Sequence, residues 1–101
     1  RAFAHAFLDR AVPAVGSTVA TAPQTLHLRF TEAVVAHFCT VQVLDARGQP
    51  VATGAPRGDD GGRTLVVDLP KLAPGAYTVV WHVTAEDTHR TEGRFGFSIA
   101  P

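Results

Sequence analysis

The sequence predicts an all-β fold, namely a single-domain Greek-key β-sandwich or barrel. Apolar and polar residues alternate with a period of two in several short stretches, as they do in half-buried strands. Glycine and proline separate these stretches, and none of them has the periodicity of a long helix. The chain of 101 residues is long enough for one packed core.

Five stretches are expected to form strands: residues 26–30, 41–43, 64–70, 77–83 and 95–99. The strand at 77–83 shows the alternation best, with one face made of Tyr77, Val79, Trp81 and Val83 and the other of Thr78, Val80 and His82. Between the first two strands, residues 32–38 (EAVVAHF) predict one helical turn at most.

Turn-forming residues separate the strands at Pro13 and Gly16, Gly48 and Pro50, residues 58–62, and Pro74 and Gly75. The segment 58–62 (GDDGG) is too short and too acidic to cradle a phosphate, and no helix follows it. It is expected to be a hairpin loop.

Charge and composition exclude several classes of function. Nine basic and nine acidic residues cancel, and arginine is not clustered along the sequence, so nucleic acid is not an expected partner. The longest apolar runs fall far short of the roughly 20 residues of a membrane span, so direct membrane insertion is not expected.

Cys39 is the only cysteine, and an internal disulfide is therefore excluded. Two interpretations remain open: a small buried core residue, or a reactive thiol or soft-metal ligand.

The chain opens with RAFAHAFLDR, in which Ala2 and Ala4 stand three and one positions before His5. Small residues at these positions are typical of the end of a secretory signal peptide. Residues 1–4 are interpreted as the tail of such a peptide or as a remnant of expression, and residues 5–101 as the domain. Cleavage after Ala4 would give His5 a free α-amino group.

Asp87 and His89 lie two residues apart, in EDTHRTEG. In an extended chain both side chains point the same way, with Cα atoms roughly 6.5 Å apart, and can converge on one metal ion. This pattern alone is weak, because surface loops produce it often. An N-terminal His5 would add an amine and an imidazole, and three nitrogens with one oxygen suit tetragonal Cu(II) better than tetrahedral Zn(II).

The other three histidines have simpler interpretations. His27 lies on the polar face of a strand and is expected to be solvated, and His37 is interpreted as a surface or packing residue rather than a ligand. His82 is open to either interpretation.

An ordered set of residues runs over nearly the whole chain and is more specific than any of its members. It consists of His5, Leu8, Pro13-Ala14, Gly16-Ser17, Ala22-Pro23, 28-LRFTE-32, Leu72, Gly75, Tyr77, Val79, Trp81, Asp87, His89, Gly93 and Phe97. In this set the chain resembles the CopC-type periplasmic copper-binding proteins of bacterial copper resistance. The resemblance implies an immunoglobulin-like sandwich, cupredoxin-like in appearance, and a location in the periplasm.

The resemblance also implies a Cu(II) site with His5, Asp87 and His89 at the family's ligand positions. Glu32 falls where members carry an acidic residue, and is interpreted either as a weak ligand or neighbour of the ligands, or as a plain surface carboxylate. Some members have a methionine-rich loop for Cu(I), but this chain has no methionine, so that second site is not expected. While residues 1–4 remain attached, His5 offers only its ring, and weaker or altered binding is expected.

Three functions are compatible with these observations. One is a periplasmic carrier or buffer of Cu(II), not an enzyme, that exchanges copper with a membrane copper transporter or another periplasmic copper protein. The others are a metal-free immunoglobulin-like interaction module and an oxidase that uses an N-terminal histidine. Four strong donors would fill the square plane around Cu(II) and leave no position for a substrate, which favours the carrier.

Overall fold

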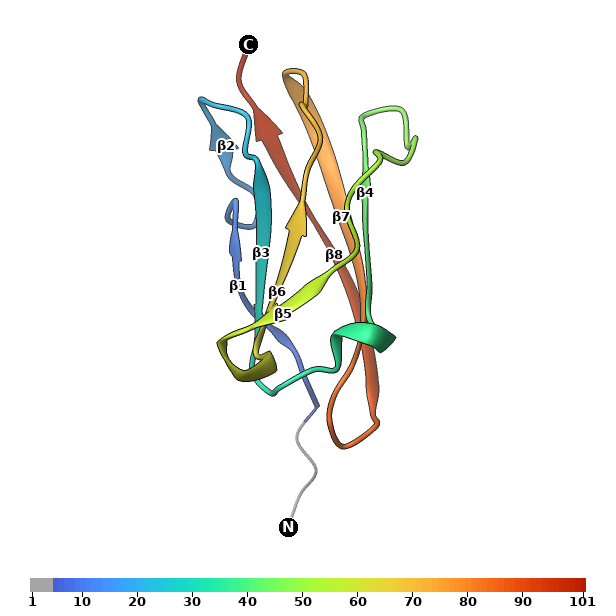
Figure 1. Cartoon of the computed structure of the whole chain (residues 1–101). Coiled ribbons are helices and arrows are strands. Elements are labelled where there is room, and N and C mark those ends of the chain that lie inside the picture. Colours follow the sequence, from blue (N-terminus) through green and yellow to red (C-terminus); the bar gives the residue numbers. More distant parts are fainter. Residues whose placement is uncertain (1–4) are drawn as a thin grey trace.

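The computed structural model describes residues 5–101, in which eight strands form two four-stranded sheets (Figure 1). One sheet has the order β1 (Leu8–Val12), β3 (Thr25–Phe30), β6 (Thr64–Asp68), β5 (Arg57–Asp59). The other has the order β2 (Thr18–Val19), β8 (Arg90–Ile99), β7 (Gly75–Thr84), β4 (Thr40–Leu44). Neighbouring strands are antiparallel, except that β2 is parallel to β8. The all-β sandwich predicted from the sequence is confirmed.

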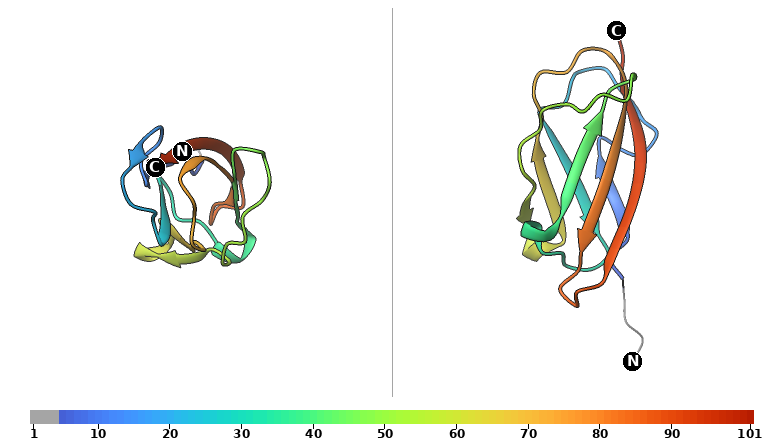
Figure 2. Two further views of the ribbon diagram at one scale, coloured as in Figure 1. Left: turned by 90° about the horizontal axis from the view of Figure 1, so that it is seen from above. Right: turned by 90° about the vertical axis from the view of Figure 1, so that its right-hand side faces the viewer.

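The core lies between the two layers, which Figure 2 shows from above. The alternation within strands selects its members, because every second side chain faces inward. In β3 the inward residues are Leu26, Leu28 and Phe30, all fully buried. The rings of Phe30 and Trp81 meet edge to face, with centroids 5.2 Å apart, and so join one sheet to the other.

The five predicted strands are all present, and the helical turn predicted in 32–38 is the 3₁₀ turn η1 (Ala36–Phe38). The hairpin at 58–62 also exists: β5 and β6 are antiparallel and joined by η2 (Asp60–Gly62), although Gly58 and Asp59 belong to β5. Strands β1, β2 and β5 were not predicted. They are short or largely exposed; in β1 only Ala11 is buried.

Cys39 is a buried core residue, which is the first of the two interpretations given from the sequence. It is 5% exposed, and its thiol donates a hydrogen bond to the carbonyl of Val35 at 3.1 Å. Burial raises the pKa of this thiol, because it disfavours the thiolate. The thiol form, which is a poor nucleophile and a poor metal ligand, is therefore the stable one.

The β7–β8 hairpin protrudes at the end of the sandwich where the chain enters β1 (Figure 1). The interpretation of residues 1–4 as a processed segment lies outside the described residues. Among the residues described, no helix has the length and apolar character that crossing a membrane requires.

Gly93 provides a test of the packing between β8 and β7. It pairs with Trp81, and a Cβ at this position would lie 2.5 Å from Cζ2 of the indole. Because Trp81 is buried, the ring cannot move aside without losing core contacts. Gly93→Ala is expected to lower the free energy of unfolding by about 1–3 kcal/mol, measured by urea denaturation.

Gly58→Ala is the matched control, since a Cβ there would meet nothing closer than the Ala36 side chain at 3.9 Å. Equal losses of stability in the two variants would contradict this account of Gly93.

Candidate metal centre

The turn between β7 and β8 is tight and holds Asp87 against His89. The Ala85 N–H donates to the carbonyl of His89 and the Thr88 N–H to the carbonyl of Ala85, both at 2.9 Å, and Thr88 has a φ of 75°. The chain is therefore not extended between Asp87 and His89, and that expectation was wrong. The turn gives a closer approach instead: Asp87 Oδ2 lies 3.2 Å from Nδ1 of His89, and Asp87 Oδ1 accepts the His89 N–H at 3.1 Å.

Hydrogen bonds fasten the N-terminal segment to the same end of the sandwich. The Thr91 hydroxyl, at the start of β8, donates to the carbonyl of Ala6. Thr31, just after β3, donates its hydroxyl to the His5 carbonyl at 3.3 Å and accepts the Phe7 N–H at 3.0 Å. Ala6 itself is buried in the core. Residues 5–7 are thus fixed between the ends of β3 and β8.

These constraints bring the rings of His5 and His89 together. Their centroids are 4.8 Å apart with planes inclined at 42°, and the ring of Phe7 is stacked with that of His5 at a centroid distance of 6.1 Å. His5 and Asp87 are exposed and His89 is half-buried, so solvent reaches all three. Two imidazoles and one carboxylate from opposite ends of the chain therefore share one accessible surface, as the sequence predicted.

The carboxyl of Asp87 has a pKa below its ordinary value. The main cause is the hydrogen bond from the His89 N–H, which favours the ionised form. The hydrogen bond with the His89 ring and the charges of His89 and His5 act in the same direction, while partial desolvation opposes them. Asp87 is consequently an anion over the physiological pH range and able to attract a cation.

Within residues 5–101, no three side chains of histidine, cysteine, aspartate or glutamate are already arranged to hold one ion. Nδ1 of the His89 ring lies 3.2 Å from Oδ2 of Asp87, so these two groups bond to each other in this structure. Glu32 follows Thr31 in the turn after β3 and, in the same described range, forms no hydrogen bond or ion pair with any of the three.

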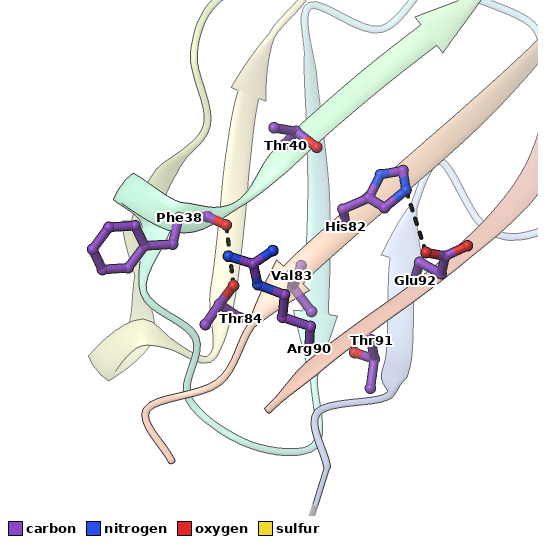
Figure 3. Close-up of a pocket in the computed structure, with 8 residues that line it drawn as sticks. All are labelled: Phe38, Thr40, His82, Val83, Thr84, Arg90, Thr91 and Glu92. Carbon is purple, nitrogen blue, oxygen red and sulfur yellow. Dashed lines mark hydrogen bonds and ion pairs between the residues drawn. The ribbon is translucent and has the colours of Figure 1, made fainter. Parts of the chain in front are cut away.

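The remaining histidines lie away from this cluster. His27 contacts the hydroxyl of Thr25 at 3.2 Å, and His37 is exposed on η1. Nε2 of His82 lies 3.5 Å from Glu92 Oε1 on the outer face of the sheet (Figure 3). Sequence reasoning assigned no role to Thr31 and Thr91, which position His5, because a threonine in a strand or turn carries no distinctive signal.

Comparison with known proteins is consistent with this architecture. Residues 8–100 match the sequence model of the CopC domain, and the chain belongs to the CopC family. Protein YobA of Escherichia coli K12 is 36% identical over 99 residues, which cover 96% of this chain and 80% of that protein.

Two solved structures have the same fold. The crystal structure of CopC from Methylosinus trichosporium OB3b is 35% identical, with a TM-score of 0.91 over 96% of this chain and 95% of that one. PcoC from Escherichia coli, described as a methionine-rich copper resistance protein, is 26% identical, with a TM-score of 0.86 over 95% and 99% of the two chains.

The lowered pKa of Asp87 gives a testable prediction. In the metal-free protein its carboxyl, followed by ¹³C NMR, should titrate below the midpoint of an unfolded chain. Because the folded pKa is the lower one, ionised Asp87 stabilises the fold above the unfolded pKa, and this contribution is lost as pH falls through the folded pKa.

The variant His89→Ala keeps the backbone donor but loses the ring. Its Asp87 carboxyl should therefore titrate above the wild-type midpoint but still below that of an unfolded chain. A wild-type midpoint at or above the unfolded one would contradict this account of the turn.

Proposed function

We propose that this protein is a carrier or buffer of Cu(II) in the bacterial periplasm and that it has no catalytic activity. The observation that supports this most is the approach of the His5 and His89 rings to 4.8 Å beside the anionic Asp87. Membership of the CopC family and the description of PcoC as a copper resistance protein support copper as the metal.

The proposed ligands are an imidazole nitrogen from His5, another from His89, and a carboxylate oxygen from Asp87. If the chain begins at His5, its α-amine supplies a fourth donor in a chelate with its own imidazole. Divalent copper leads the affinity order for such nitrogen and oxygen donors. If His89 binds the ion through Nδ1, its hydrogen bond with Asp87 has to open, whereas binding through Nε2 leaves this bond intact.

The donors favour Cu(II) over Cu(I). Monovalent copper prefers thioether and thiolate sulfur, and the sequence contains no methionine. The thiol of Cys39 is buried and bonded to Val35, so it is not available on the surface that holds His5 and His89. A single Cu(II) site without a methionine-rich Cu(I) site is therefore proposed.

A carrier explains this donor set better than an enzyme does. A catalytic metal keeps a coordination position open for substrate or water. Two imidazoles, one carboxylate and one amine would occupy all four strong positions of tetragonal Cu(II). The exposure of the cluster suits exchange of the metal with a second copper protein, such as a membrane copper transporter or a periplasmic carrier.

Substitution of His89 tests the ligand assignment. His89→Ala removes one imidazole from the proposed site and should weaken Cu(II) binding at least about 100-fold, beyond the 10–100-fold typical of losing a group that only supports a ligand. Affinity is measured by competition with a chelator of known affinity, using quenching of Trp81 fluorescence as the signal.

His27→Ala is the matched control, because His27 lies on β3 and contacts Thr25 rather than the cluster. Its affinity should equal that of the wild type. If the two variants bind Cu(II) equally well, or if the wild type binds none, the proposed function is wrong.

A further inference from the structure

A hollow of about 380 Å³ lies on the outer face of the sheet, where β4, β7 and β8 run side by side (Figure 3). Six of its residues matter here: Phe38, Thr40, His82, Thr84, Arg90 and Glu92. Strand register creates it, since Thr40 pairs with His82, His82 with Glu92, and Thr84 with Arg90. We call it the outer hollow.

Arg90 supplies a positive charge to the outer hollow, and Glu92 in the same lining carries one negative charge. Within residues 5–101 the Arg90 side chain has no ion pair and no hydrogen bond, although a guanidinium carries five donors. Glu92 is the only carboxylate of the lining, and it faces His82 at 3.5 Å. The hydrogen-bond donors of the Arg90 guanidinium therefore suit an external oxyanion, and a carboxylate matches their planar arrangement.

The rim of the outer hollow is apolar on one side. Phe38 is 67% exposed, which is unusual for a large aromatic side chain. Its carbonyl accepts a hydrogen bond from the Thr84 hydroxyl at 3.2 Å. Figure 3 shows Arg90 between Phe38 and His82. A ligand with a carboxylate and a short carbon skeleton would contact Arg90 and Phe38 together.

The outer hollow lies next to the candidate metal centre, because Arg90 directly follows His89 and starts β8. In water, Cu(II) is held by small organic acids through carboxylate oxygens, and a multicarboxylate complex of this kind is an anion. A complex bound at Arg90 through a free carboxylate would bring its metal to the end of the sheet where the preceding residue, His89, belongs to the candidate metal centre.

We propose that the outer hollow binds complexes of Cu(II) with small organic acids through one of their carboxylates. The bound complex then transfers its copper to the metal centre. This inference rests on the proposed function. In the transfer, imidazole nitrogens replace carboxylate oxygens around the ion and the oxidation state does not change. The substrate class of the site is then Cu(II) in anionic carboxylate complexes.

The first experiment measures carboxylate binding without copper. Citrate is titrated into the metal-free 101-residue protein, and amide shifts are followed by NMR. Thr40, Thr84 and Arg90 should shift in the wild type and not in Arg90→Gln. Arg94→Gln is the matched control, because Arg94 is an exposed arginine four residues further along β8 and outside the lining. Shifts that are absent, or that persist in Arg90→Gln, would overturn the inference.

The second experiment measures copper uptake by stopped-flow fluorescence of Trp81. Arg90→Gln should slow uptake from Cu(II)–citrate by about tenfold, the low end of electrostatic steering, and Arg94→Gln should not. Uptake from the neutral bis-glycine complex and the final affinity should be the same in all three proteins.

Equal rates from Cu(II)–citrate in all three proteins, or equal slowing in both variants, would overturn the inference while leaving Cu(II) binding intact. Failure of the wild type to bind Cu(II) from the glycine complex would instead overturn the proposed function, and the inference with it.

Discussion

The candidate metal centre depends on one long-range hydrogen bond, from the Thr91 hydroxyl to the carbonyl of Ala6. It joins residues 85 positions apart and ties the segment that follows His5 to the strand that follows His89. The register of the β7–β8 ladder fixes Thr91, and the burial of Ala6 fixes its partner. Thr31 adds a second attachment from β3. Together with the pairing of β1 and β3 and the burial of Ala6, these bonds hold His5 close to the hairpin.

The sequence predicts the central strands because their two faces differ in polarity. In β7, Tyr77, Val79, Trp81 and Val83 are buried while His82 is exposed, so the period of two is visible without coordinates. The strands β1, β2 and β5 bury few side chains and hold their places through main-chain hydrogen bonds to a neighbour. Main-chain hydrogen bonds leave little trace in composition, and these strands were missed for that reason.

The proximity of His5, Asp87 and His89 could be predicted from the sequence, but the geometry of the turn that holds them could not. The spacing of Asp87 and His89 and the position of His5 indicated that these side chains meet, and they do. The D-x-H segment was expected to be extended, yet Thr88 adopts a positive φ and the segment closes a tight turn. Turn conformation at a single residue is decided by the strands it connects, and a pattern of three residues does not encode it. Glu32 follows Thr31 at the same end of the sandwich, but within residues 5–101 no hydrogen bond or ion pair of its side chain assigns it a role.

The central claim is that residues from the two ends of the chain bind one Cu(II) ion. Pulsed EPR of the Cu(II)-loaded protein beginning at His5, with ¹⁵N-labelled histidine, tests it most directly, because it counts the imidazoles bound to the metal. Two coordinated imidazoles are expected in the wild type and one in either His5→Ala or His89→Ala. A spectrum that is the same in all three proteins would contradict the claim.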